Sequence, residues 1–174
     1  MGADNNALLV LANYDFRDEE FKDTFQALKD AGIETKIAAM SNEDCKGVGG
    51  TLVSVDFTLD EVEAIQYGAI VFIGGIGIED YLHDESVHAL AKSFHESGKI
   101  IGAICWAPAI LANAGILNGK RVTAWDGAKE DIVQSGATFT GEAISVDGTL
   151  ITANGPDAAS QFGMVIAKMI IGEI

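Results

Sequence analysis

Ile100-Ile-Gly-Ala-Ile-Cys-Trp-Ala-Pro108 carries the clearest structural signal in this 174-residue chain. Its first five residues are all apolar or small, as in a strand that is covered on both faces of a sheet. Residues 107–114 then have the pattern of a helix that stops at Gly115. A strand that passes directly into a helix is typical of α/β proteins, and Cys105 lies at the turn between the two.

Strand-like and helix-like segments alternate on both sides of this stretch. The predicted strands are residues 7–12, 33–40, 51–55, 69–73, 100–104 and 121–125, and the predicted helices are residues 18–31, 60–65, 84–96, 107–114, 129–135 and 161–171. Asp147-Gly148 predicts a type I′ turn between strands 143–146 and 149–152. The order predicts an α/β fold in one domain over residues 1–174, with a mainly parallel sheet, helices on both faces and a small antiparallel hairpin.

Composition and charge exclude several classes of protein. Hydrophobic residues make up 48% of the chain and only two residues are proline, which is typical of an ordered domain. The net charge of −15 argues against nucleic acid and anionic membranes as partners, because no basic patch is present to neutralise phosphates. No apolar run reaches the ~20 residues of a membrane-spanning helix.

Two observations favour the cytoplasm. Cys45 and Cys105 form neither a disulfide framework nor a zinc-binding pattern, so reduced thiols are the simpler interpretation. The stretch Met1–Asn6 has no basic residue ahead of the first apolar run, and we therefore expect no secretory signal. Cys45 lies in a polar turn region and is expected to be a bystander or an exposed oxidisable thiol.

The turn at Cys105 has features of a nucleophile elbow. In parallel sheets the functional site lies at the carboxyl ends of the strands, and Cys105 follows such an end. A thiol there faces a helix N-terminus, which favours the thiolate. The backbone N–H groups of Trp106 and Gly75 could stabilise an oxyanion, with Gly74 permitting close backbone approach. From the turn alone, an ordinary buried cysteine is an equally good interpretation.

Four stretches together resemble the ThiJ/PfpI superfamily. They are Leu8-Leu-Val-Leu-Ala12, Val71-Phe-Ile-Gly-Gly75, residues 99–123 around the elbow, and Asp147-Gly-Thr-Leu-Ile-Thr-Ala-Asn-Gly-Pro156. The resemblance implies a flavodoxin-like sandwich like that of class I glutamine amidotransferases, with Cys105 as nucleophile or redox centre. It also implies an acid–base partner at the start of the first helix, and the family spacing from Ala31-Gly32 assigns this role to Glu20 rather than Asp18 or Glu19. Without the resemblance, these three acids would simply be a first-turn cluster.

The chain departs from the family pattern where histidine is expected. Trp106 stands where PfpI-type members carry histidine, and Trp125 stands where deglycase-type members carry it. The histidines of this chain are His83, His88 and His95, and no Cys–His pair is evident. Since histidine usually protonates the leaving amine in amide hydrolysis, a peptidase is disfavoured. Glu79 matches a position that PfpI-type oligomers use across a subunit interface, but there is no histidine for it to orient.

Five residues are expected to line the pocket around Cys105. They are Tyr14, Asp15, Gly74, Trp125 and Asp126. Trp106 and Trp125 either wall this pocket or belong to the core, as most aromatic residues do. Lysine and arginine are scarce near these positions, so no clamp for a phosphate or carboxylate is expected.

Three functions are compatible with these observations. The first is a cysteine-dependent enzyme of glyoxalase or deglycase type, in which Cys105 attacks a small reactive carbonyl and Glu20 moves protons. The second is an intracellular cysteine peptidase of PfpI type, and the third is a non-enzymatic redox-sensing or protective module that uses oxidation of Cys105. No cofactor and no metal are expected. The expected partners are a small-molecule substrate and further copies of the chain, in a homodimer or a larger homo-oligomer.

Overall fold

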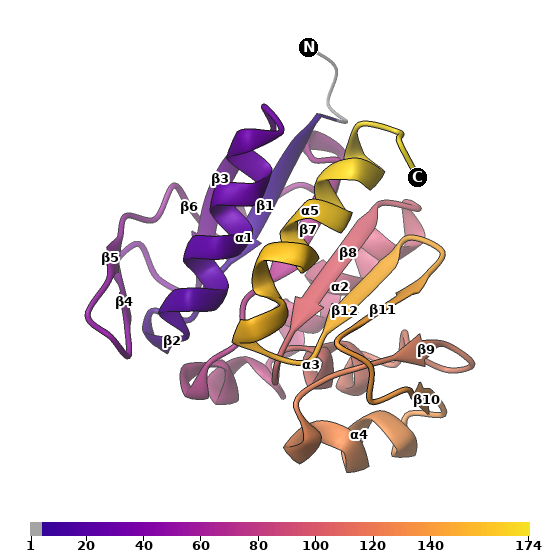
Figure 1. The fold of residues 1–174 in the computed structure, drawn as a ribbon. Helices are drawn as coiled ribbons and strands as arrows, with labels where there is room; N and C mark the ends of the chain where they lie inside the picture. Colours follow the sequence, from indigo (N-terminus) through magenta and orange to yellow (C-terminus); the bar gives the residue numbers. More distant parts are fainter. Residues whose placement is uncertain (1–4) are drawn as a thin grey trace.

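The computed structural model describes residues 5–174 (Figure 1). Met1–Asp4, the greater part of the stretch in which no secretory signal is expected, lies outside the described residues. Among the described helices, none is both long and apolar enough to cross a bilayer.

A seven-stranded sheet forms the centre of the molecule. Its strands, in spatial order, are β11 (Ile144–Asp147), β12 (Leu150–Ala153), β8 (Ile100–Ile104), β7 (Ala69–Phe72), β1 (Asn6–Val10), β3 (Glu34–Ala39) and β6 (Phe57–Thr58). Every neighbouring pair is parallel except β11 and β12, which form the antiparallel hairpin. Strands β7 and β8 lie next to each other, so the segments that follow Phe72 and Ile104 emerge side by side at one edge of the sheet.

Helices cover both faces of the sheet. Helices α1 (Asp18–Asp30) and α5 (Ala159–Ile170) lie side by side on one face, whereas α2 (Glu85–Glu96) and α3 (Pro108–Asn113) pack on the other (Figure 1). Because successive strand residues point to opposite faces, Leu8 contributes to the core under α2 and Leu9 to the core under α1. The continuous apolar runs of the sequence follow from this two-sided burial.

Glycine allows α5 to pack closely in two directions. A Cβ atom at Gly163 would lie 2.7 Å from the Cβ of Ala27 in α1, and one at Gly102 in β8 would lie 2.8 Å from Cδ1 of Ile166. At Gly163 a larger side chain would also meet the backbone of Thr24, so α1 and α5 would have to move apart, whereas at Gly102 the side chain of Ile166 could shift instead. Gly163 therefore permits the close approach of α5 to α1.

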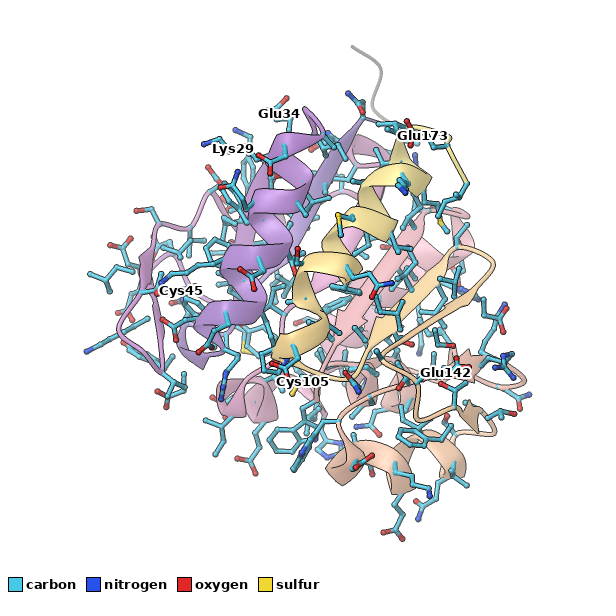
Figure 2. The ribbon with its side chains drawn as sticks, in the orientation of Figure 1. Lys29, Glu34, Cys45, Cys105, Glu142 and Glu173 are labelled. Atoms are coloured by element: carbon cyan, nitrogen blue, oxygen red, sulfur yellow. The ribbon has the colours of Figure 1, made fainter. Side chains whose placement is uncertain are left out.

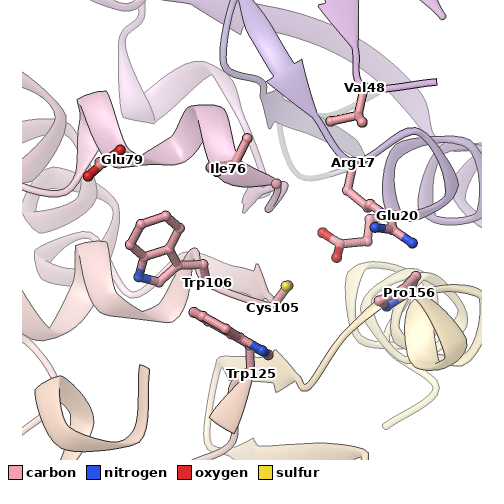
Figure 3. Close-up of a pocket in the computed structure, with 10 residues that line it drawn as sticks. Arg17, Glu20, Val48, Ile76, Glu79, Cys105, Trp106, Trp125 and Pro156 are labelled. Atoms are coloured by element: carbon pink, nitrogen blue, oxygen red, sulfur yellow. The ribbon is translucent and has the colours of Figure 1, made fainter. Parts of the chain in front are cut away.

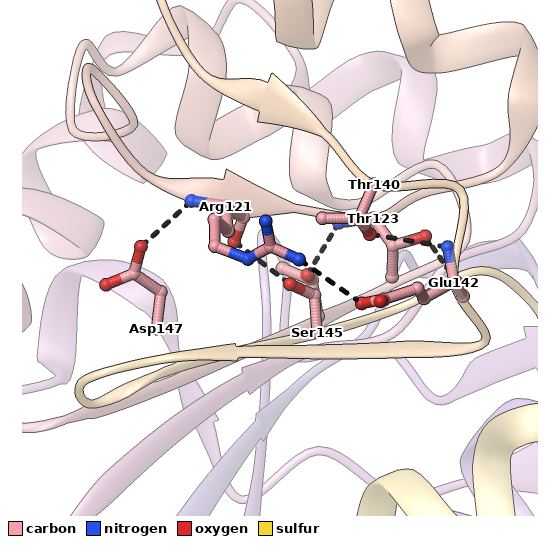
Figure 4. A network of polar contacts seen from close by, with 7 residues as sticks. Arg121, Thr123, Thr140, Glu142, Ser145 and Asp147 are labelled. Carbon is pink, nitrogen blue, oxygen red and sulfur yellow. Dashed lines mark hydrogen bonds and ion pairs between the residues drawn. The ribbon is translucent and has the colours of Figure 1, made fainter.

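Two small sheets flank the central one. The first contains β2 (Tyr14–Phe16), β4 (Cys45–Gly47) and β5 (Leu52–Val53), and the second contains β9 (Arg121–Val122) and β10 (Thr138–Phe139). A polar network ties the second sheet to the β11–β12 hairpin (Figure 4). In it, the backbone N–H of Arg121 donates to Asp147 (2.9 Å) and the hydroxyl of Ser145 donates to the carbonyl of Arg121 (3.2 Å).

The predicted fold class is confirmed, and several predicted elements need correction. Residues 121–125 are not a strand of the main sheet, because only Arg121 and Val122 form a strand, and it pairs with β10 in the second small sheet. After Val122, the N–H of Thr123 donates to the Thr152 hydroxyl and the N–H of Trp125 donates to the carbonyl of Cys105. The predicted helix at 60–65 is two 3₁₀ turns, Leu59–Glu61 and Ala64–Gln66. The predicted strand 51–55 shortens to β5, and helix 129–135 is α4 (Lys129–Gln134).

Candidate active site

The turn after β8 holds Cys105 in an uncommon backbone conformation. Its φ is +63°, in the left-handed region that residues with a Cβ atom rarely adopt. Hydrogen bonds hold the residue on both sides: its N–H donates to the carbonyl of Ala153 (2.9 Å), and its carbonyl accepts from Trp125 (2.8 Å). The strand β8, the turn and helix α3 therefore present the thiol at the edge of the sheet.

Gly74 provides the space beside this turn. A Cβ atom there would lie 2.7 Å from Oε2 of Glu20, 2.8 Å from the Cβ of Cys105 and 2.8 Å from the carbonyl oxygen of Ile104. The absence of a side chain at Gly74 is thus what allows Glu20 and Cys105 to approach the same point. Gly75 follows with φ +113° and lines the pocket.

Glu20 is completely buried at the start of α1. Its Oε2 accepts a hydrogen bond from the N–H of Gly74 (3.0 Å), whereas its Oε1 has no hydrogen-bond partner within residues 5–174. Burial raises the pKa of Glu20 to about 7, although the Cys105 thiol and the N–H of Gly74 act in the opposite direction. The carboxyl group is therefore able to hold or release a proton near neutral pH.

Cys105 and Glu20 form a coupled pair. Burial, followed by the charge of an ionised Glu20, raises the pKa of the Cys105 thiol to about 12, while the N–H of Trp106 and the charge of Arg17 act to lower it. The predicted preference for the thiolate is therefore not supported, because burial and an ionised Glu20 outweigh the N–H of Trp106 at the start of the next helix. Protonation of Glu20 removes the repulsion and makes the carboxyl a donor toward the sulfur.

The three acids at the start of α1 point to different surroundings. Asp18 accepts hydrogen bonds from the N–H groups of Gly49 (2.6 Å) and Thr51 (2.9 Å), so it holds the turn between β4 and β5. Burial alone would raise the pKa of Asp18, but these hydrogen bonds outweigh it and lower the pKa to about 2. Glu19 is exposed and accepts from Nε of Arg17 (2.8 Å). Of the three, Glu20 is the one that lines the pocket with Cys105.

A cavity of about 570 Å³ opens above the Cys105–Glu20 pair (Figure 3). The residues that line it are Arg17, Glu20, Val48, Gly75, Ile76, Glu79, Cys105, Trp106, Trp125 and Pro156. Of the residues predicted to line the pocket, Trp125 does so and Gly74 lies directly behind Glu20 and Cys105. Tyr14, Asp15 and Asp126 are not in the lining: Tyr14 donates to Glu43 instead, and Asp126 borders a separate surface hollow beside α4.

Sequence reasoning missed several lining residues. Arg17 places a positive charge in the pocket and is not among the residues expected to line it. Val48, Ile76 and Pro156 come from three segments without regular strand or α-helix structure. No local pattern marks them, because only the tertiary arrangement of these segments brings them to the mouth of the pocket.

Trp106 and Trp125 form one wall of the pocket. Their ring centroids are 5.9 Å apart with an interplanar angle of 68°, an edge-to-face arrangement. Trp106 is partly buried, whereas Trp125 is 48% exposed. A Cβ atom at Gly127 would collide with the Trp125 ring, so the glycine leaves the space in which the ring lies. Both tryptophans therefore line the pocket, and Trp106 also packs against the core under α2 and α3.

No histidine lines the cavity in the part of the chain that the structure describes. Nε2 of His88 lies 2.8 Å from the carbonyl oxygen of Leu82, His83 contacts Asn113, and His95 borders two other hollows near the start of β8. Within residues 5–174, no group of three or more histidine, cysteine or acidic side chains could hold a metal ion.

Cys45 and Cys105 lie in different parts of the molecule (Figure 2) and differ in accessibility. The expectation of an exposed thiol at Cys45 is wrong, because the side chain is completely buried in β4 and burial raises its pKa to about 12. Cys105 is partly exposed and lines the cavity.

Iodoacetamide should therefore label Cys105 well before Cys45 in the folded protein at neutral pH. Peptide mapping after a short reaction measures the two sites separately, and urea-unfolded protein, in which both thiols are accessible, is the control. Equal labelling of the two thiols in the folded state would contradict the difference in exposure between Cys45 and Cys105.

Comparison with known proteins places the chain in a family. The model of the DJ-1/PfpI family matches residues 5–169. An uncharacterized protein of Methanocaldococcus jannaschii is 36% identical over 166 residues, which cover 94% of this chain and 81% of that protein. Deglycase PfpI of Pyrococcus furiosus is 31% identical over 149 residues, or 86% and 90% of the two chains. The crystal structure of a ThiJ/PfpI domain protein from Brachyspira murdochii superimposes with a TM-score of 0.94 at 30% identity and covers 98% of both chains. The chain therefore belongs to the DJ-1/PfpI family.

Proposed function

We propose that this protein is a cysteine-dependent enzyme that converts small α-oxo aldehydes into α-hydroxy acids. The observation that carries the proposal is the buried Glu20 carboxyl, which lines the same pocket as Cys105 and whose Oε1 has no hydrogen-bond partner within residues 5–174. A nucleophile and one group that titrates near pH 7 are what this conversion requires. The deglycase name of the Pyrococcus furiosus relative is compatible with carbonyl chemistry.

The reaction starts with transfer of the thiol proton to Glu20. The sulfur of Cys105 attacks the aldehyde carbon, and the resulting oxyanion takes the proton back from Glu20 to give a hemithioacetal and an ionised Glu20. Glu20 then removes the hydrogen on the former aldehyde carbon and returns it as a proton to the neighbouring ketone carbon, while the hydroxyl proton of the hemithioacetal moves to the ketone oxygen. This step oxidises the first carbon to a thioester and reduces the second to an alcohol, so no external oxidant or reductant is needed.

Hydrolysis completes the cycle. Water attacks the thioester, the carbon–sulfur bond breaks, and the α-hydroxy acid leaves while Cys105 regains its proton. The backbone N–H groups of Trp106 and Gly75 are the proposed donors to the oxyanions of the first and last steps, since both residues line the pocket beside the sulfur. The N–H of Gly74 is already engaged by Glu20 and is not available for this purpose.

Two other functions fit the pocket less well. Peptide hydrolysis needs an acid that protonates the leaving amine, and the residues around Cys105 include no histidine. A protective role through oxidation of Cys105 is compatible with the same pair, because a protonated Glu20 could donate to a sulfinate. The protective role requires no substrate turnover, so a measurement of turnover distinguishes it from the proposed enzyme.

A substrate comparison tests the proposal. Purified protein is incubated at neutral pH with methylglyoxal, glyoxal and casein, and the loss of dicarbonyl and the release of peptides are followed in parallel. We expect loss of both dicarbonyls and no cleavage of casein. Cleavage of casein that disappears in Cys105→Ser would support the peptidase, and loss of neither substrate class would support the protective role.

We also propose that the protein is a homo-oligomer, because apolar side chains remain exposed around the pocket mouth. Ile76 is 63% exposed and Val48 is 60% exposed, and burial of such side chains against a second copy would be favourable. Light scattering at micromolar concentration should give at least twice the chain mass of 18.3 kDa. A mass that stays at that of one chain across a dilution series would contradict this.

A further inference from the structure

The cavity is far larger and more apolar than a three-carbon substrate requires. Pockets of a few hundred Å³ generally hold drug-sized ligands, and this one encloses about 570 Å³. Trp106, Trp125, Ile76, Val48 and Pro156 make up half of its lining residues. Methylglyoxal would bury only a small part of these walls, so most of the pocket's apolar surface has no function in the conversion of that compound.

The two tryptophans and Glu20 lie on different sides of Cys105. Figure 3 shows Glu20 and Arg17 on one side of the sulfur and the rings of Trp106 and Trp125 on the other. A carbonyl bound to the sulfur can thus turn its reacting atoms toward Glu20 while its substituent extends along the tryptophans. Edge and face contacts with these rings favour an apolar or aromatic group over a polar one.

Charge argues that this substituent is neutral. Among the described residues, Arg17 is the one cation in the lining, and its Nε already donates to Glu19 at 2.8 Å. The other charged lining residues, Glu20 and Glu79, are acids, and the whole chain carries a net charge of −15. This field repels an anionic substituent, and only the remaining N–H groups of Arg17 could bind one.

We propose that Trp106 and Trp125 are specificity-determining residues that select α-oxo aldehydes with a neutral aromatic or bulky apolar substituent. The inference rests on the proposed function, because it names the substrate class of the same site. The Trp125 side chain is the main contact, since it is 48% exposed and its ring is held between Gly127 and Trp106. A conversion of phenylglyoxal to mandelate follows the same balanced steps as that of methylglyoxal to lactate.

Steady-state kinetics of two substrates test the selection. We expect kcat/KM for phenylglyoxal to exceed that for methylglyoxal by about 10-fold or more in the unaltered protein. Trp125→Ala should lower the phenylglyoxal value by about 10- to 100-fold, mainly through KM, and leave methylglyoxal nearly unchanged. Met164→Ala removes an equally exposed apolar side chain from α5, outside the pocket lining, and should change neither value. Because phenylglyoxal also modifies arginine, initial rates are used and intact mass is checked afterwards.

A binding experiment keeps the inference separate from the proposed turnover. Acetophenone has the aromatic ketone but no aldehyde, and it should slow iodoacetamide labelling of Cys105 in the unaltered protein and not in Trp125→Ala. Turnover of methylglyoxal without preference for phenylglyoxal, and without protection by acetophenone, overturns the inference and leaves the proposed function standing. Protection by acetophenone without turnover of either aldehyde supports the aromatic site and overturns the proposed function.

Discussion

Cys105→Ser should lower kcat/KM for methylglyoxal on the order of 10⁴-fold or more, the size of effect that removal of a covalent nucleophile produces in other enzymes. Serine has nearly the same shape, but its hydroxyl does not ionise near neutral pH, and Glu20 is too weak a base to activate it. The left-handed backbone at this position, φ +63°, is already adopted by a residue with a Cβ atom, so the exchange adds no new backbone strain. Dicarbonyl loss measured under pseudo-first-order conditions gives the rate.

The matched control for this variant is Cys45→Ser. Cys45 is buried in β4 outside the cavity lining, so its exchange should affect stability more than turnover. Thermal unfolding of both variants identifies any loss of folded protein. Turnover by folded Cys105→Ser at a rate close to that of the unaltered protein would mean that Cys105 is not the nucleophile.

Glu20→Gln should lower kcat by about 10²- to 10⁴-fold, because glutamine keeps the shape but can neither take up nor release the proton. With the pKa of Glu20 near 7, kcat of the unaltered protein should change around neutral pH, and this inflection should be absent in the variant. Asp23→Asn is the control, since Asp23 is an exposed acid on the same helix. If Glu20→Gln retained both the rate and the inflection, the acid–base role would belong to another group.

The same variant should be more stable than the unaltered protein at high pH. The pKa of Glu20 lies above the ordinary glutamate value of 4.5, because burial disfavours ionisation in the folded state. Below about pH 4 the carboxyl is protonated in both the folded and the unfolded state, so it does not change the free energy of unfolding. As the pH rises through about 7 the penalty develops fully, up to about 3 kcal/mol from a shift of this size. Urea unfolding at low and high pH measures the gain, and a variant that is less stable at both would contradict this electrostatic account.

The sequence contained enough information for the fold and for the centre of the site. Apolar runs such as residues 69–73 and 100–104 predicted buried parallel strands, because burial on both faces removes the polar alternation of an exposed strand. The turn at Cys105 could be located because a buried apolar strand passes directly into a helical pattern there. Glu20 could be assigned only through the family spacing, since Asp18 and Glu19 are chemically indistinguishable from it in the sequence.

The walls of the site could not be predicted in the same way. Val48 reaches the pocket because Asp18 holds the β4–β5 turn through the N–H groups of Gly49 and Thr51, a contact between segments about thirty residues apart. Trp125 was expected at the end of a strand, but it is placed by its hydrogen bond to the carbonyl of Cys105. Such contacts depend on tertiary packing and leave no periodic pattern in the sequence.

Proton NMR of methylglyoxal incubated with the protein in heavy water tests the central proposal most directly. If Cys105 and Glu20 act as proposed, the unaltered protein produces lactate as methylglyoxal disappears, and deuterium enters at the carbon that carries the new hydroxyl. Cys105→Ser and Glu20→Gln should produce lactate only at the rate seen without protein. Loss of methylglyoxal without lactate, or lactate formed equally well by Cys105→Ser, would contradict the proposed enzyme.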